Sequence, residues 1–226
     1  MIGAFASAQR DGPSMPARRR GGPRTPCGRL GAMSDGVRTG RLPWPAPDDL
    51  GHEARRVYDA IVAGPRTAHD GPTALVDIDG RLLGPFNAMV QASPAVGDAL
   101  QRLGAGIRYG SALSGRVREL AVLTVAAERR SEFEWWAHAG PAAAAGLTDD
   151  MLEAIARQDA GFFEYDDALV HGAVRELLLD RDLSQNTFEQ LEDLLGTRAV
   201  VDLVILVGYY DLLALTLRTF RVPLPD

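Results

Sequence analysis

Two acids and one histidine have the types and the spacing needed for proton transfer. Glu134 and His138 are four positions apart, so on a helix their side chains project from one face, one turn from each other. A carboxylate there can orient an imidazole and favour its protonated form, which suits general acid or base chemistry near neutral pH. Glu119 lies on the preceding helical segment, and antiparallel packing would bring it to the same place. We therefore expect a cluster of two acids and one base.

The same spacing is also common in ion pairs on solvated helix faces, so the neighbours of the pair decide its interpretation. A helix that is apolar all round is buried, and buried polar groups have partners. The residues beside Glu134 and His138 are apolar: Trp135, Trp136, Ala137 and Ala139. The cluster is therefore expected inside the protein, with a structural ion pair as the main alternative to a catalytic site.

The composition excludes several other kinds of chemistry. All 24 basic residues are arginine, so the chain offers no lysine for Schiff-base formation or for a phosphate-binding P-loop. The single cysteine, Cys27, lies in an irregular N-terminal stretch, where a catalytic thiol would have no rigid support. The chain has no H-E-x-x-H motif and no second clustered histidine. We expect neither a metal nor an organic cofactor.

The charges are unevenly distributed along the chain. Residues 1–41 hold eight of the 24 arginines and two of the 30 acids, so residues 42–226 carry 16 arginines against 28 acids, a net charge of −12. A body this acidic repels a phosphate backbone, and the sequence indicates no basic face, so nucleic-acid binding is not expected. The lone cysteine favours a cytoplasmic location.

The N-terminal stretch, residues 1–41, mixes arginine with glycine, proline and serine and shows no apolar period. This composition predicts a disordered leader. It also fits a transit peptide, but we favour an extension upstream of a later start at Met33. One folded domain is expected over residues 45–226.

From residue 45 onward the apolar residues recur at helical spacing, which predicts an all-α domain of roughly seven to eight helices. The expected helices cover residues 50–61, 93–107, 114–129, 132–140, 148–155, 166–179, 184–195 and 197–220. At Pro141 the helix from residue 132 either ends after Gly140 or continues with a kink. Ser93 and Ser114 are placed to cap two of them. A turn or small hairpin is expected at Asp79-Gly80. The buried face of the second helix is predicted to consist of Val96, Leu100, Leu103 and Ile107.

The last expected helix is apolar enough to raise the question of a membrane span. Asp202 and Asp211 interrupt it, and an acid at membrane depth costs roughly 2.5 to 3.5 kcal/mol. We therefore interpret it as a buried or oligomer-facing helix and expect no membrane contact.

Three runs of residues in this helical region resemble the carboxymuconolactone decarboxylase family, whose fold is an AhpD-like helical bundle. The resemblance covers a core of about residues 84–157 and extends more weakly over most of 45–226. The runs are Arg116-Val-Arg-Glu-Leu-Ala-Val-Leu-Thr-Val-Ala-Ala-Glu, Glu132-Phe-Glu-Trp-Trp-Ala-His and Ala144-Ala-Gly-Leu-Thr-Asp-Asp. The flanking segments Gly84-Pro-Phe-Asn-Ala-Met-Val and Val201-Asp-Leu to Gly208-Tyr-Tyr are similar to longer family members.

The resemblance implies which activity to expect and which to doubt. AhpD-like hydroperoxidases use a C-x-x-C pair, and the two cysteine positions here hold Ser131 and Glu134. Because a thiolate is the nucleophile in peroxide reduction, peroxidase activity is the least expected function. The Glu-x-x-x-His form is similar to the decarboxylase branch, a lyase of aromatic compound catabolism that acts on a small lactone carboxylate without a cofactor.

The expected mechanism uses His138 to move a proton at carbon, with Glu134 holding the imidazole in one tautomer and Glu119 assisting. Arg116 is a candidate for holding a substrate carboxylate, with a solvated helix position as the alternative. The candidate substrate-binding set is Arg116, Ser131, Trp135 and Asn87. The resemblance also implies a homo-oligomer, either a trimer or a hexamer. The alternative to an enzyme is a catalytically silent oligomeric binding or scaffold protein.

Overall fold

The computed structural model describes residues 40–66 and 75–225. All described residues lie in one unit, Gly36–Asp226. Most of the predicted leader, Cys27 included, lies outside the described residues.

The all-α prediction is confirmed, because the described residues form α-helices, two short 3-10 helices and no strand. The α-helices of this part of the chain number nine, one more than the expected range. Their bounds are α1 His52–Val62, α2 Pro85–Gln91, α3 Pro94–Gly110, α4 Gly115–Arg129, α5 Glu132–Ala144, α6 Asp149–Ala156, α7 Tyr165–Leu179, α8 Gln185–Leu195 and α9 Thr197–Phe220. The 3-10 helices are Pro47–Asp49 and Ala160–Phe162.

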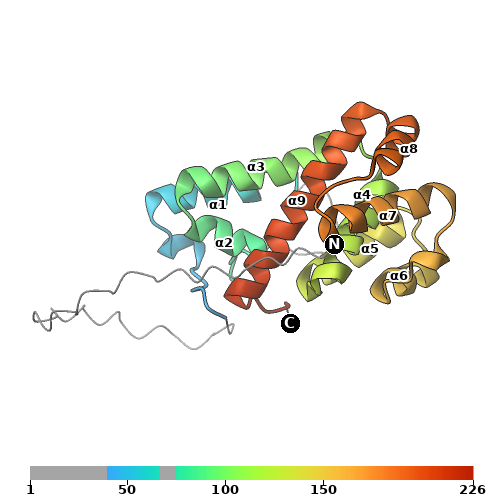
Figure 1. The fold of residues 1–226 in the computed structure, drawn as a ribbon. Helices are drawn as coiled ribbons and strands as arrows, with labels where there is room; N and C mark the ends of the chain where they lie inside the picture. Colours follow the sequence, from blue (N-terminus) through green and yellow to red (C-terminus); the bar gives the residue numbers. More distant parts are fainter. Residues whose placement is uncertain (1–39, 67–74, 226) are drawn as a thin grey trace, which may run out of the picture. The chain divides into compact units, whose positions relative to one another are not determined.

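Two helices organise the packing. The middle of α4, residues 119–126, is buried on every side, and this helix packs against α5, α6, α7 and α9. Helix α9 packs against α4, α7 and α8 and also against α2 and α3, so it lies between the first three helices and the later ones (Figure 1). The long apolar C-terminal segment is thus a core helix along much of its length.

The predicted turn at Asp79-Gly80 is confirmed, whereas α2 was not expected. An isolated antiparallel bridge pairs Val76 with Leu82 around that turn. Helix α2 has only seven residues, too few for a clear apolar period, and it begins after Gly84. The backbone of Gly84 has a φ of 56°, and an added Cβ there would lie 2.1 Å from the ring of Phe133. Glycine therefore lets α2 approach the start of α5.

The predicted buried face of α3 is confirmed in part, since Ile107 is buried and Leu100 packs half-buried against the core. Val96 and Leu103 are wrong, being 60% and 43% exposed, and Ser93 precedes the helix without a side-chain cap bond. The other buried residues of α3 are Gly97, Gln101 and Gly104. An added Cβ would lie 2.0 Å from a backbone oxygen of Met89 at Gly97, and 2.2 Å from the Tyr209 hydroxyl at Gly104. Close approach of neighbouring segments, and not side-chain apolarity, therefore selects this face.

The other cap predictions are confirmed. Ser114 accepts a hydrogen bond from the backbone N–H of Val117 at the start of α4. Thr148 does the same for Met151 at the start of α6. Helix α5 does not end after Gly140, since it continues through Pro141 to Ala144.

Helix α9 also meets the length and apolarity expected of a membrane span, but half of its most apolar window is buried within the protein. Core helices of soluble proteins have the same property. The two acids that interrupt the helix have partners inside the chain. Asp202 accepts a hydrogen bond from the backbone N–H of Ala112, and Asp211 pairs with Arg129 and Arg181.

Candidate acid–base site

The turn between α4 and α5 brings the predicted cluster together. Arg130 and Ser131 form this turn, and Arg130 adopts the left-handed conformation with a φ of 53°. Because the chain reverses its direction in this turn, α4 packs against α5. Glu119 of α4 therefore lies beside His138 of α5, which also contacts Glu134. All three side chains are buried.

Glu119 holds one nitrogen of the histidine ring. Its Oε2 lies 2.7 Å from Nδ1 of His138, and its Oε1 lies 3.3 Å from Nε of Arg118. Burial would raise the pKa of Glu119, but the hydrogen bond and charge of His138, with Arg108 and Arg118 nearby, hold this pKa below its ordinary value. The carboxylate therefore accepts a hydrogen bond from Nδ1–H, which leaves Nε2 as the nitrogen that faces the other groups.

Glu134 and Tyr210 lie beside Nε2. Oε2 of Glu134 is 3.6 Å from this nitrogen, and the hydroxyl of Tyr210 is 3.3 Å from it. Burial raises the pKa of Glu134 from 4.5 to about 7, against the opposing charges of His138 and Arg108. Burial with Glu134 and Glu119 nearby also holds the pKa of Tyr210 well above its ordinary value. Glu134 is thus the carboxyl group that exchanges its proton near neutral pH.

The predicted roles of the two acids are therefore exchanged. We expected Glu134 to hold the imidazole and Glu119 to assist. The short contact to Nδ1 belongs to Glu119, whereas Glu134 stands at the other nitrogen and its Oε1 has no hydrogen-bond partner among the described residues. The four-residue spacing on one helix correctly predicted that Glu134 and His138 lie together. It does not determine which of the two acids orients the imidazole ring.

A cavity of about 130 Å³ opens beside Nε2. Glu134, His138 and Pro141 of α5 line it, so the proline in the helix is part of the wall. The remaining lining residues are Arg66, Leu75, Leu83, Pro85, Phe86, Gly104, Arg108, Tyr109, Phe133, Ala137, Tyr209, Tyr210 and Leu213. The walls are thus largely apolar, with a few convergent polar groups, as is typical of small-molecule sites. Glu119 lies behind the histidine and does not line the cavity.

Two arginines of this cavity, Arg66 and Arg108, have no salt-bridge partner among the described residues. Nη1 of Arg66 is buried without a hydrogen-bond partner among the described residues, although Nη2 donates to the carbonyl oxygen of Gln101. Burial lowers the pKa of Arg66. Arg108 is half-buried and forms no salt bridge with any residue in the described ranges. A cavity with these two cations favours an anionic ligand.

Three of the predicted substrate-binding residues lie outside this cavity. Asn87 is buried, but its amide donates to the carbonyl oxygen of Pro43. Trp135 packs against the main core. Ser131 precedes α5 and lines a different cavity. The structure therefore gives none of the three a contact with the space beside His138.

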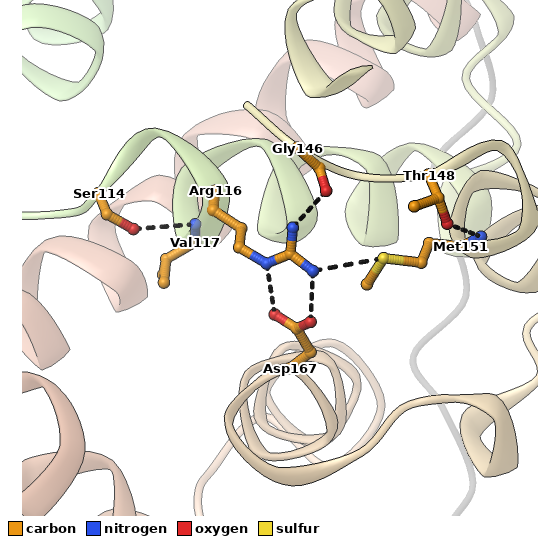
Figure 2. A network of polar contacts seen from close by, with 7 residues as sticks. All are labelled: Ser114, Arg116, Val117, Gly146, Thr148, Met151 and Asp167. Carbon is orange, nitrogen blue, oxygen red and sulfur yellow. Dashed lines mark hydrogen bonds and ion pairs between the residues drawn. The ribbon is translucent and has the colours of Figure 1, made fainter. Parts of the chain in front are cut away.

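Arg116 is also misplaced by the sequence interpretation, and it is not a solvated residue either. Its Nε and Nη2 donate to the two carboxylate oxygens of Asp167, at 3.1 and 2.7 Å (Figure 2). Nη1 donates to the carbonyl oxygen of Gly146, and Nη2 also contacts the sulfur of Met151. The guanidinium thus ties α4 to α6 and α7, and its bidentate carboxylate contact is already made to Asp167.

Sequence reasoning missed Arg66 and Arg108 as cavity residues. They come from segments far from α5 in sequence, and neither falls in a motif with Glu134 or His138. Tyr209 and Tyr210 are buried residues of the apolar helix α9 and also line the cavity. Tyr209 closely approaches Gly104 of α3, a contact that appears only in the folded chain.

Comparisons with known proteins identify the region that holds the cluster. Residues 94–174 match the Carboxymuconolactone decarboxylase family. No curated protein and no solved structure gave a match to the chain. The matched region contains Glu119, Glu134 and His138. The match to this family thus covers the region whose motifs, in α4 and α5, carry the resemblance.

Proposed function

We propose that this protein is a cofactor-independent acid–base enzyme that acts on a small lactone or carboxylic acid, in the manner of a carboxy-lyase. One observation carries the proposal: Nε2 of His138 faces a cavity, between Glu134 and Tyr210, while Glu119 holds Nδ1. A histidine oriented by a carboxylate, with its other nitrogen open to a cavity, is the arrangement that general acid–base catalysis requires.

We propose that the proton for the reaction comes from Glu134 and His138, whose Oε2 and Nε2 lie 3.6 Å apart. Loss of carbon dioxide breaks a carbon–carbon bond and leaves its electron pair on the substrate, delocalised into the neighbouring carbonyl group. That carbanion then takes a proton at carbon from one of these two groups, and solvent restores it. The pKa of Glu134, raised by burial to about 7, suits both the donation and the recovery at neutral pH.

Arg66 and Arg108 are the residues that we propose to hold the substrate carboxylate. Both line the cavity with His138, and each has donors that are not engaged in a salt bridge within the described ranges. A guanidinium binds a carboxylate through two parallel N–H bonds, which also fixes the orientation of the ligand. These residues replace Arg116, which Asp167 occupies.

The two other functions rest on weaker support. A silent scaffold needs no open cavity beside the ion pair, and the cavity is what favours an enzyme. A peroxidase needs a thiol near the histidine, yet Ser131 and Glu134 stand at the family's cysteine positions. The single cysteine of the chain, Cys27, lies outside the described residues.

The test is a panel of small lactones and unsaturated carboxylic acids, incubated with wild-type protein and with the His138→Asn variant. Substrate loss and carbon dioxide release are measured for each compound. We expect turnover of at least one anionic lactone by the wild type and none by the folded variant. Equal turnover in both proteins, or no turnover anywhere in the panel, would remove the proposal.

We also propose that the chain forms a homo-oligomer through one face of α9. The exposed apolar side chains of this helix recur at helical spacing along one face: Val201, Val204, Ile205, Leu212 and Leu215. Replacement of Val204 and Leu215 by glutamate should convert the assembly to a monomer in size-exclusion chromatography with light scattering. An unchanged mass would place the interface elsewhere.

A further inference from the structure

A second cavity, of about 400 Å³, lies where the turn between α4 and α5 meets the C-terminal end of α9. It contains none of the three acid–base residues, and Phe133 is the only residue that lines both cavities. Its apolar wall comes from the end of α9 and the residues after it: Ala214, Leu217, Val222, Pro223 and Leu224. Its polar lining residues are Arg129, Arg130, Ser131, Glu132, Arg218 and Arg221.

Ser131 leaves a buried donor without a partner at this cavity. Its side chain is only 8% exposed, and Oγ makes no hydrogen bond within the described part of the chain. Ser131 stands at the N-cap of α5 but accepts no bond from the helix, unlike Ser114, Thr148 and Ser184, which all cap their helices. The first N–H groups of α5 therefore lack the usual capping oxygen. An external acceptor would satisfy both the hydroxyl and these N–H groups.

Arginines surround this unsatisfied helix start. Arg130, Arg218 and Arg221 are exposed, line the cavity and form no salt bridge with any described residue. A fourth, Arg129, is already paired with Asp211. Glu132 is the only acid in the lining, which leaves two more free arginines than acids.

This local charge is opposite to that of the rest of the domain. Residues 42–226 carry a net charge of −12, so three free arginines at one cavity are a departure from the average surface. The sequence indicated no basic face because these arginines come from the ends of two helices that are about 90 positions apart. Only the fold brings them together.

We propose that this second cavity binds a phosphate-type oxyanion carried by a small molecule. The N-terminus of α5 supplies backbone N–H groups and the positive end of the helix dipole, Ser131 supplies a hydroxyl, and the three free arginines supply charge. Phosphate fits better than carboxylate, because its additional oxygen atoms can accept from all of these donors at once.

Isothermal titration of the full chain with inorganic phosphate, at constant ionic strength, tests the site. We expect saturable binding of one phosphate, weakened about tenfold by Arg218→Gln and by Arg130→Gln, since each removes a charged donor. Ser131→Ala should weaken it about threefold, for a neutral hydrogen bond. Arg56→Gln, which changes an exposed arginine of α1, and Arg108→Gln, in the acid–base cavity, should leave the affinity unchanged.

Circular dichroism melting of each variant shows whether it is folded, and Arg130→Gln and Arg218→Gln report on opposite walls of the cavity. The proposal is overturned if phosphate binds the wild type without saturation, or if both of these folded variants keep the wild-type affinity. Acetate that binds as tightly as phosphate would overturn the assignment to a phosphate-type ligand. Loss of binding in Arg108→Gln alone would move the site to the acid–base cavity.

Discussion

Two polar clusters depend on the first turns of α4, and they differ in how completely their groups are satisfied. Arg116 has a partner at every guanidinium nitrogen, and its contacts join three helices (Figure 2). One turn later, Glu119 holds His138, but Glu134 keeps an oxygen without a partner and Nε2 faces a cavity. A polar group with partners at every nitrogen stabilises the fold, whereas a buried group left open toward a cavity is available for chemistry.

The largest expected effect is on activity, from the change Glu119→Gln. The variant keeps the shape of the side chain but removes the carboxylate that holds Nδ1 of His138. We expect kcat/KM to fall by about 100-fold or more, within the range for general acid–base catalysis. The rate of turnover of the best compound from the lactone panel measures the fall. A variant within a factor of two of the wild type would show that Glu119 has only a structural role.

The second effect is on stability, from Glu134→Gln. The folded pKa of Glu134, about 7, lies above the ordinary 4.5, so the folded protein binds the extra proton between these values. Its contribution is therefore complete below pH 4.5 and is lost as pH rises to about 7, by up to about 3 kcal/mol. Urea unfolding at pH 5 and pH 8 should show this loss in the wild type and much less of it in the variant.

Glu132→Gln, in the same turn of α5 but exposed, is the matched control for that comparison. It should retain the pH dependence of the wild type. If Glu134→Gln also retains it, the carboxyl group of Glu134 is ionised at pH 5 and is not the proton donor.

The third effect separates the two clusters directly. Arg116→Gln removes the bidentate pair with Asp167, and because these side chains are partly exposed we expect a loss of only about 1 to 2 kcal/mol in the free energy of unfolding. Turnover under conditions where the variant is folded should not change. Denaturant unfolding and a rate measurement on the same sample check both statements. A selective rise in KM would return Arg116 to the substrate site.

The smallest effect concerns substrate binding. Arg108→Gln should raise KM about tenfold for a carboxylate substrate and leave kcat nearly unchanged, because it removes one charged contact of the ligand. The unfolding free energy should stay close to that of the wild type, in contrast to Arg116→Gln. A methyl ester of the same substrate is the control, since its affinity should not depend on Arg108.

Local signals predicted the helices well and the packing less well. Ser114, Thr148 and Ser184 each cap the helix that the sequence placed after them, because a cap acts within three residues. Helix α2 was missed because seven residues cannot show a period. The buried face of α3 was partly misplaced because glycines at positions 97 and 104, and not large apolar side chains, face its neighbours.

The candidate site was predictable only where its members share a helix or the next one along the chain. Glu119, Glu134 and His138 meet that condition, since a two-residue turn joins their helices. The roles of the two acids depend on which nitrogen each one reaches, which spacing does not determine. Arg66 approaches the same cavity from the turn after α1, and Arg108 from α3, through contacts that only the folded chain creates.

The most direct test of the central claim is exchange of carbon-bound hydrogen in D₂O, which detects proton transfer even where no net reaction follows. Anionic lactones and their carboxylic acids are incubated with wild type, His138→Asn and Arg116→Gln, and deuterium uptake is followed by NMR. We predict uptake beside the carbonyl group with the wild type and with Arg116→Gln, and none above background with folded His138→Asn. Equal uptake with all three proteins, or loss in Arg116→Gln but not in His138→Asn, would contradict an acid–base site at His138.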